Sequence, residues 1–190
     1  MATLRAAGLD PEVVVSGVDE SGVVAESVAE LTAALAELKA RAVHDRLTTD
    51  ERPLVLIGCD SMLELDGRPY GKPGSAAAAI ERWQRMRGRS GVLHTGHHVV
   101  VVDGDRVVRA AAVGSTTVHF AALTDAEIEA YVATGEPLQV AGAFTVDGLG
   151  GAFVTRIEGD HHNVVGISLP LLRSLLAEAG VAWPSLWATR

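Results

Sequence analysis

The feature that most constrains the fold of this chain is a short apolar run, residues 54–58, that leads directly into Cys59 and Asp60. A continuous apolar run of this length is typical of a strand buried on both faces of a sheet. A carboxylate after such a strand must be solvated, paired or bound to a metal, because an isolated buried charge has a large desolvation cost. Ligands gather at the carboxyl ends of strands in open α/β sheets. Asp60 is therefore a candidate site residue, with a helix cap or a structural ion pair as the alternative.

Two other charged positions stand out by their neighbours. The apolar run 13–15 precedes Asp19 and Glu20, which repeats the pattern of carboxylates after a strand, with a solvated turn as the alternative. Lys72 lies between a glycine and a proline that stiffen an irregular loop. A lysine in a surface turn is usually only solvated, so its neighbours alone do not assign it a function.

Four helices are predicted from periodicity and capping patterns. Apolar residues recur at helical spacing over 28–46, and this helix carries Lys39. A serine cap predicts a second helix over 75–87, and a capping-box pattern predicts a third over 124–134. The leucine-rich residues 169–179, followed by a glycine, predict a fourth.

Strands are predicted mainly in the second half of the chain. Residues 97–102 and 106–113 are separated by a glycine turn, which predicts a hairpin, and 116–120 predicts a third strand beside it. Residues 141–157 carry five glycines among apolar residues and predict a strand pair with a turn near Asp147. At 190 residues and 48% hydrophobic, the chain is long enough for one well-buried domain. The sequence therefore predicts a single α/β domain over residues 1–190.

Composition narrows the possible partners. The net charge of −8 argues against broad affinity for nucleic acid or an anionic membrane surface, so phosphate binding must be focal. A single cysteine cannot form an internal disulfide and fits a reducing compartment. No signal segment or membrane-spanning run is recognisable. We therefore expect a soluble protein of the cytoplasm.

Two histidine pairs and a glycine-rich stretch imitate binding motifs. The pairs at 97–98 and 161–162 suggest metal ligands, but neighbouring side chains on a strand point to opposite faces, so neither pair is expected to hold one ion. The glycines of 148–151 lack the strand-to-helix context of a dinucleotide site. Neither feature predicts a function.

Short motifs recur in a fixed order over nearly the whole chain, from Thr3 to about Gly180. In chain order they are Val18-Asp19-Glu20, Leu38-Lys39-Ala40, Gly58-Cys59-Asp60-Ser61, Asp66-Gly67, Gly71-Lys72-Pro73, His94-Thr95-Gly96, Thr117-Val118-His119-Phe120, Tyr131-Val132-Ala133-Thr134-Gly135-Glu136, Ala141-Gly142-Ala143-Phe144 and Asn163-Val164-Val165-Gly166. Each motif is weak alone, whereas the ordered set is specific, and it resembles the Maf family.

The resemblance implies a mixed α/β fold with a strongly twisted sheet, in two lobes around a nucleotide cleft, commonly dimeric and related to the inosine-triphosphate pyrophosphatase fold. It also implies hydrolysis of nucleoside triphosphates to the monophosphate and pyrophosphate with Mg²⁺ or Mn²⁺. Asp60 would then be the proton acceptor, Glu20 and Asp60 the carboxylates linked to the metal, and Lys39 and Lys72 the contacts to the triphosphate. These residue types suit the chemistry, because the metal bridges phosphate oxygens, a carboxylate deprotonates water and lysines offset charge on the departing pyrophosphate.

The first departure from the family pattern is at the start of the chain. Maf proteins generally begin with an apolar strand and a Ser-x-Ser-Pro-Arg-Arg type loop, whereas this sequence opens where the following helix is expected. We expect the upstream DNA to encode a strand and a loop of roughly 10 to 20 residues. The competing interpretation is a nucleotide-binding regulatory protein, linked to cell division, that has lost catalysis.

The second departure is at residues 145–148, where the thymidine/uridine-triphosphate branch of the family has Gly-Ile-Gln-Gly and this chain has Asp147 in place of the glutamine. The surrounding residues resemble the branch that acts on 7-methylguanosine triphosphate. An aspartate accepts hydrogen bonds from guanine N1 and the exocyclic amine, whereas a glutamine also donates to a pyrimidine carbonyl. Asp147 is therefore a candidate substrate-binding residue.

Overall fold

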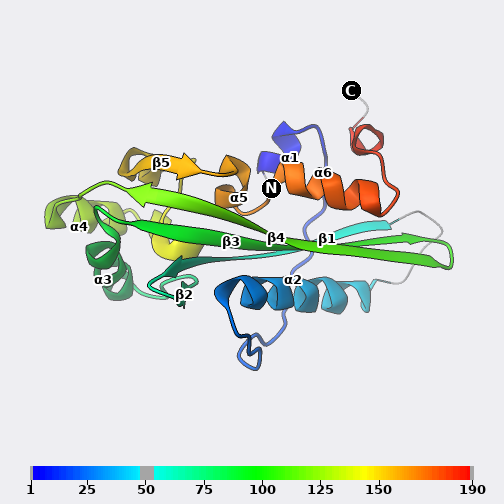
Figure 1. The fold of residues 1–190 in the computed structure, drawn as a ribbon, viewed down its shortest axis with the longest axis horizontal. Coiled ribbons are helices and arrows are strands. Elements are labelled where there is room, and N and C mark those ends of the chain that lie inside the picture. The colour runs from blue at the N-terminus through cyan, green and yellow to red at the C-terminus, as the bar shows by residue number, and fades with distance from the viewer. Residues whose placement is uncertain (1, 48–53, 189–190) are drawn as a thin grey trace.

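The computed structural model describes residues 2–47 and 54–188, and its centre is a long sheet with helices on both faces (Figure 1). Helix α2 covers one face, and α6, with α1 beside it, covers the other. The helices and strands, in chain order, are α1 (Ala2–Ala6), α2 (Val28–His44), β1 (Leu54–Leu65), β2 (Arg68–Tyr70), α3 (Ala76–Met86), β3 (Ser90–Asp103), β4 (Arg106–Phe120), α4 (Asp125–Ala133), β5 (Val154–Glu158), α5 (His161–Val165) and α6 (Leu169–Glu178). Four 3-10 helices are η1 (Glu136–Gln139), η2 (Ala141–Ala143), η3 (Leu149–Phe153) and η4 (Trp183–Leu186).

The α/β class is confirmed, and so are the four predicted helices, which correspond to α2, α3, α4 and α6. Their ends follow local chemistry, because a side-chain oxygen at each N-cap accepts a hydrogen bond from a backbone N–H of the first turn. The capping box of α4 is present with both of its hydrogen bonds, between Thr124 and Glu127. No helix in the described part of the chain is long and apolar enough to cross a membrane.

The sheet has the strand order β2-β1-β3-β4-β5, and every neighbouring pair is antiparallel. The predicted hairpin is confirmed as β3 and β4, but the prediction of a separate strand over 116–120 was wrong, because those residues continue β4. Gly114, which lies between the two predicted ranges, pairs in register with Thr95. A Cβ on Gly114 would lie 2.3 Å from Asn163 Oδ1, so this glycine permits a close approach rather than a turn.

Strand β1 is longer than the apolar run that predicted it. It continues to Leu65, and Asp60 pairs with Gly96 in its middle rather than at its end. The prediction that Asp60 lies at the edge of the sheet by the carboxyl-end rule was therefore wrong, since that rule belongs to parallel sheets. Strand β2 pairs with β1 only from Leu63 to Leu65, so within the described residues the outer edge of β1 before Leu63 has no strand partner.

Helix α2 lies unusually close to the sheet because two of the strand residues beneath it are glycines. A Cβ on Gly58 would lie 2.5 Å from the Ala36 carbonyl oxygen, and one on Gly96 would lie 2.2 Å from the Thr32 carbonyl oxygen. No side chain fits at either position without moving the helix. We call these two close contacts, at Gly58 and Gly96, the seat of α2. They fix the distance of α2 from the sheet, and therefore the position of Lys39 relative to Asp60.

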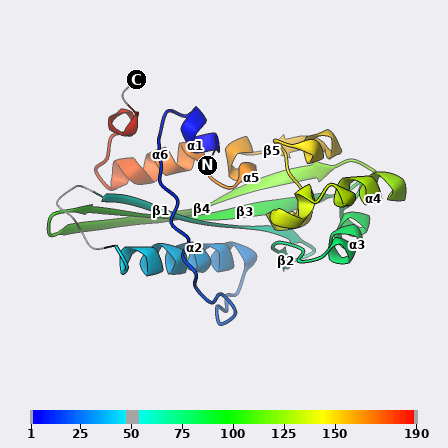
Figure 2. The ribbon, with the colours of Figure 1, turned by 180° about the vertical axis from the view of Figure 1, so that it is seen from behind.

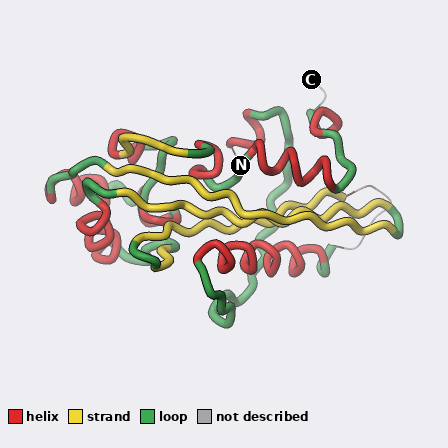
Figure 3. The backbone as a smooth tube through the Cα atoms, in the orientation of Figure 1, coloured by secondary structure: helices red, strands yellow, loops and turns green. Residues whose placement is uncertain are grey.

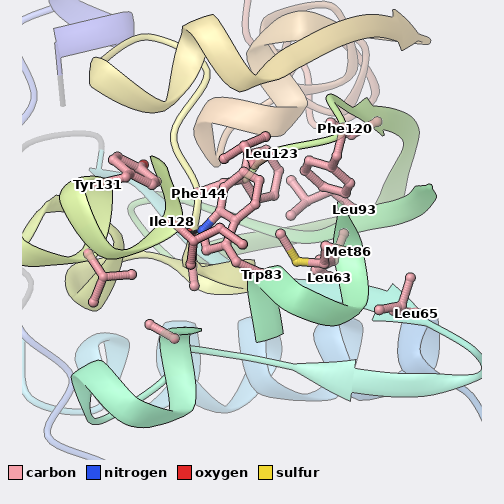
Figure 4. Packing of buried hydrophobic residues seen from close by; sticks show 14 residues of the cluster. Leu63, Leu65, Trp83, Met86, Leu93, Phe120, Leu123, Ile128, Tyr131 and Phe144 are labelled. Carbon is pink, nitrogen blue, oxygen red and sulfur yellow. Dashed lines mark hydrogen bonds between the residues drawn. The ribbon is translucent and has the colours of Figure 1, made fainter. Parts of the chain in front are cut away.

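An aromatic cluster fills the end of the sheet near α3 and α4 (Figure 4). Trp83 lies at its centre, with edge-to-face contacts to Phe120, Tyr131 and Phe153 at centroid distances of 5.6, 5.7 and 6.0 Å. Its indole N–H donates to the Ala143 carbonyl at 2.8 Å. Such aromatic pairs contribute about 0.5–1.5 kcal/mol each beyond area burial, so the cluster anchors the loop that contains Ala143.

The predicted strand pair over 141–157 was wrong. The structure has η2, η3 and then the single strand β5 in this region. Gly142 adopts a left-handed conformation with φ of 74°, which an extended strand does not allow. The Glu136 side chain accepts hydrogen bonds from the N–H groups of Leu149 and Gly150, both at 3.0 Å, so these donors are not available to a hairpin ladder.

The apolar run 13–15 does not form the strand that its composition suggested. It belongs to an irregular segment, residues 10–27, that runs from the α1 layer past the sheet to the α2 layer (Figures 2 and 3). Its valines are 61%, 44% and 78% exposed, so burial does not favour a strand there. The Arg46 guanidinium donates to the Val15 carbonyl at 2.8 Å and ties the segment to the end of α2.

Candidate active site

The structure brings together three of the predicted site residues, Glu20, Lys39 and Asp60. The Lys39 ammonium on α2 donates to Asp60 Oδ1 at 2.5 Å and pairs with Glu20 Oε1 at 2.9 Å. The side chain of Asp60 is 11% exposed, that of Lys39 24% and that of Glu20 44%. The cluster therefore opens to solvent on the side of the irregular segment, from which Glu20 comes.

Burial disfavours the charged form of Asp60 in this cluster. Burial raises the pKa of its carboxyl, and the hydrogen bond and charge of Lys39 only partly oppose this rise. Burial by itself would lower the pKa of Lys39, but its hydrogen bonds to Asp60 and Glu20 outweigh burial and raise it. Asp60 Oδ2 is buried and has no hydrogen-bond partner. A buried carboxylate oxygen without a donor or a cation is costly, which points to a ligand at this atom.

Lys72 lies on the loop after β2, close enough for its charge to lower the pKa of Asp60. The antiparallel pairing of β2 with β1 directs the chain beyond Tyr70 back along β1 toward Asp60. The Gly71 carbonyl accepts hydrogen bonds from Arg82 Nη1 at 2.5 Å and from the Gly142 N–H at 3.2 Å. Two donors from separate elements thus fix the loop, while the Lys72 side chain stays exposed.

Asp147 is not part of this cluster. It is exposed between Thr145 and Leu149, and no described residue forms a hydrogen bond or ion pair with its side chain. Its loop nevertheless begins at Gly142, which contacts the backbone of Gly71 beside Lys72. The loop therefore lies on the side of the site that carries the second lysine.

The donor set of the cluster fits a magnesium-like ion. Within residues 2–47 and 54–188 no three or more His, Cys, Asp or Glu side chains are arranged to hold a metal by themselves. Magnesium usually takes one or two carboxylates, and phosphate oxygens and waters complete its shell. Glu20 and Asp60 supply two carboxylates, and Asp60 Oδ2 has no hydrogen-bond partner that would compete with the ion.

The histidine pairs have other roles. His97 Nε2 accepts a hydrogen bond from the Ser168 N–H at 2.8 Å, and burial lowers the pKa of His97, so it is a neutral acceptor in the core. The pair His161 and His162 was expected on a strand, which was wrong, because both residues begin α5. Asp160 caps that helix and accepts from the His162 N–H at 3.0 Å.

A cavity of about 820 Å³ adjoins the cluster. It lies between the irregular segment and the first half of β1, and Glu20, Lys39 and Cys59 are among its lining residues. Burial raises the pKa of Cys59 to about 12, so this thiol is protonated and unreactive at neutral pH.

Sequence reasoning missed a second polar cluster, formed by Glu64, His94 and Ser115. His94 Nε2 lies 3.0 Å from Glu64 Oε2, and His94 Nδ1 lies 2.8 Å from Ser115 Oγ. The three residues come from β1, β3 and β4. His94 belongs to one of the family motifs, but Glu64 and Ser115 do not, and only the register across three strands brings the three together.

Known proteins match this chain along most of its length. The family model described as Maf-like protein matches residues 1–179. The chain is 63% identical over 188 residues to a nucleoside triphosphate pyrophosphatase of Salinispora tropica, and the match covers 98% of this chain and 82% of the relative. Proteins of the same name from Cutibacterium acnes and Streptomyces coelicolor are 53% and 54% identical, with 97% and 99% of this chain and 88% and 89% of those proteins covered. Matches of this extent show that the chain belongs to the Maf-like protein family.

Proposed function

We propose that this chain is a nucleoside triphosphate pyrophosphatase that releases pyrophosphate and a nucleoside monophosphate. The observation that carries the proposal is Asp60, which has one oxygen held by Lys39 and the other buried without a partner. Burial of this kind is typical of a group that meets its partner only when substrate is bound. The similar proteins are named nucleoside triphosphate pyrophosphatases, which supports the same activity.

In the proposed reaction, Asp60 accepts a proton from a water molecule as the water oxygen attacks the α-phosphorus. The new bond joins that oxygen to the α-phosphorus, and the bond between the α-phosphorus and the oxygen that bridges to the β-phosphorus breaks. The bridging oxygen leaves with the pyrophosphate. Because burial raises the pKa of Asp60, its carboxylate is a stronger proton acceptor than a solvated one.

Lys39 and Lys72 would stabilise the negative charge that collects on the departing pyrophosphate. Lys39 is already beside Asp60, and Lys72 lies on the loop fixed by Arg82 and Gly142. Preorganised positive charges in a partly desolvated site are more effective than the same charges in water. The two lysines approach from α2 and from the loop after β2, so they can contact different parts of the triphosphate.

Glu20 and Asp60 would hold a divalent ion, Mg²⁺ or Mn²⁺. When bound, such an ion neutralises phosphate charge and polarises the phosphoryl oxygen. Both carboxylates also pair with Lys39, so the ammonium lies beside the place where we expect the ion. Asp60 Oδ2 is buried without a hydrogen-bond partner, so no described residue competes with such an ion for this atom.

A guanine nucleotide, such as 7-methylguanosine triphosphate, is the substrate class that we propose. Asp147 is exposed on the loop next to the Lys72 side of the site, and its carboxylate offers two acceptors to guanine N1 and the exocyclic amine. Pyrimidines present a different edge, which an aspartate satisfies less well.

The test is a product analysis of the protein with Mg²⁺ or Mn²⁺ and a panel of GTP, 7-methyl-GTP, ATP, UTP and dTTP. We expect equal amounts of monophosphate and pyrophosphate. Release of orthophosphate alone would place cleavage at the outer phosphate and overturn the proposal. Calorimetric binding of nucleotide without turnover would instead favour a nucleotide-binding regulatory protein.

A further inference from the structure

The cluster of Glu64, His94 and Ser115 lies on the same face of the sheet as Asp60, and the proposed reaction does not use it. Asp60 and Glu64 are four residues apart on β1, so both side chains point to the α2 side. At a rise of about 3.3 Å per residue, their Cα atoms are about 13 Å apart. His94 pairs across the strands with Met62, the residue between them on this face.

Helix α2 does not extend over this cluster. Its residue Thr32 lies over Gly96, and its first residue, Val28, is four positions nearer the cluster, which is about 6 Å along the helix axis. Figure 1 shows β3 and β4 continuing beyond the first turn of α2 toward α4. The exposures agree, because the side chain of Glu64 is 33% exposed and Ser115 is exposed, whereas His94 is buried between them.

Hydrogen bonds to His94 hold Glu64 in one orientation. With a proton on Nε2, the imidazole donates to Glu64 Oε2 and accepts from the Ser115 hydroxyl at Nδ1. The second Glu64 oxygen, Oε1, forms no hydrogen bond with any described residue. The result is a fixed anionic acceptor that faces solvent, with a serine oxygen beside it. This arrangement is complementary to a ligand that presents hydroxyl donors.

We propose that Glu64, positioned by His94 and assisted by Ser115, binds the 2′-hydroxyl of the substrate's ribose. The inference rests on the proposed function, because it assumes that the α-phosphate lies at Asp60. In a nucleoside triphosphate the ribose directly follows the α-phosphate. The Asp60 and Glu64 side chains point the same way, so their carboxyl groups are about as far apart as the Cα atoms, and about 13 Å leaves room for the attacking water, the α-phosphate and the ribose between them. Carboxylates bind ribose hydroxyls in this way in other nucleotide sites.

The test compares ribose with deoxyribose in one base series. For the unmodified protein we expect kcat/KM for GTP to exceed that for dGTP by at least about tenfold, as expected for hydroxyls bonded to a charged acceptor. Glu64→Gln should bring the ratio close to one by raising KM for GTP, with little change for dGTP. Ser115→Ala should lower the ratio partly, and this exposed position does not endanger the fold. Glu129→Gln, an exposed carboxylate on α4, is the matched control and should keep the ratio.

A binding measurement separates this inference from the proposed function. Calorimetry with the non-hydrolysable α,β-methylene analogue of GTP and its 2′-deoxy counterpart reports sugar recognition without turnover. Suppose that no nucleotide releases pyrophosphate, but the GTP analogue binds more tightly than its 2′-deoxy counterpart and Glu64→Gln removes the difference. The proposed reaction is then wrong, and the ribose site stands. Equal binding of the two sugars by the unmodified protein, or an equal loss for both in Glu64→Gln, would overturn the ribose site.

Discussion

Two carboxylates in this protein, Asp60 and Glu136, have opposite environments. Glu136 accepts four hydrogen bonds, from Tyr131 Oη at 3.0 Å, Thr145 Oγ1 at 2.5 Å, and the N–H groups of Leu149 and Gly150 at 3.0 Å each. Asp60 is held at one oxygen by Lys39, and its other oxygen is buried without a partner.

The pKa shifts of the two carboxyls differ in the same way. Burial alone would raise the pKa of Glu136, but the donors around it lower the value to about 2. Burial dominates at Asp60 and raises the pKa of its carboxyl. A saturated carboxylate stabilises a loop, whereas an incompletely satisfied one retains capacity for a proton, a metal or a substrate. The comparison distinguishes a fully hydrogen-bonded acid, Glu136, from the acid that we propose as the catalytic base, Asp60.

The largest expected effect is on turnover in Asp60→Asn. The amide keeps the shape of the side chain but cannot accept the proton, so kcat should fall by about 10²–10⁴-fold. The melting temperature should not fall in parallel, because the change removes a buried charge. Steady-state pyrophosphate release and thermal unfolding on the same sample check both parts. Near-normal turnover with an intact melting transition would remove Asp60 from the base role.

Gly58→Ala tests whether the seat of α2 sets the geometry of the active carboxylate. The added methyl group would meet the Ala36 carbonyl at 2.5 Å, so α2 must shift and carry Lys39 away from Asp60. Misplacement by about 1 Å can reduce turnover by about 10²-fold, and overpacking costs about 1–3 kcal/mol of stability. Gly22→Ala is the matched control, since a Cβ there meets no atom within 4 Å. Equal activities of the two variants would contradict this account of the seat.

Glu136→Gln should lower the stability of the fold without an equivalent loss of turnover. The amide replaces one acceptor oxygen with a donor, which leaves at least one of the loop N–H or hydroxyl donors without its charged partner. We expect a loss of about 1–3 kcal/mol in the free energy of unfolding, measured by urea denaturation. Turnover per folded molecule should change far less than in Asp60→Asn. A larger loss of turnover than of stability would show that Glu136 is not only structural.

The two acids should also contribute to pH dependence with opposite sign. The Glu136 pKa falls from 4.5 to about 2 on folding, so its stabilisation is present above pH 4.5 and is lost as pH falls toward 2. The Asp60 pKa is raised above 3.8, so its contribution is present below pH 3.8 and is lost as pH rises through the raised value. Between about pH 6 and pH 2, the melting temperature of Glu136→Gln should fall less steeply than that of the unmodified protein. Parallel curves would show that Glu136 does not supply this dependence.

The smallest expected effect is on substrate choice in Asp147→Gln. Asp147 lies in the short span that Glu136 holds at Thr145 and Gly150, so the structural acid would orient the residue that contacts the base. We expect a several-fold shift in the ratio of kcat/KM values from GTP toward UTP, because glutamine also donates a hydrogen bond. Unchanged ratios would remove Asp147 from base recognition.

Features encoded by neighbouring residues could be predicted from the sequence. The Thr124 capping box and the periodicity of α2 depend only on residues within one or two turns, and both were correct. The region 141–157 was wrongly predicted to be a hairpin. The Glu136 side chain, earlier in the chain, accepts hydrogen bonds from the backbone N–H groups of Leu149 and Gly150, so these groups do not pair with another strand. Local patterns contain no sign of such contacts.

Some residues of the candidate site could likewise be found from local motifs, and others could not. The family resemblance assigned Lys39 and Asp60 to one site, because each lies in its own recognisable motif, whereas their direct contact is known only from the structure. Glu64 was missed because the apolar run that predicted β1 stops at Gly58, and only a strand that continues to Leu65 puts Glu64 on the face of Asp60. Cross-strand register then decides its neighbours, and that register depends on the burial pattern and turns of the whole sheet rather than on residues near Glu64.

The irregular segment 10–27 has a consequence for how the site assembles. Asp60 lies on a central part of the sheet and Lys39 on a helix seated against it, whereas Glu20 comes from a stretch with no helix or strand before α2. Backbone amides in such a stretch exchange with solvent readily, because few hydrogen bonds restrain them. A ligand that engages Glu20 together with Asp60 would slow that exchange and convert part of its binding energy into order of the chain. If metal and nucleotide bind here as proposed, their affinity is set partly by the entropy of a segment that contributes one carboxylate.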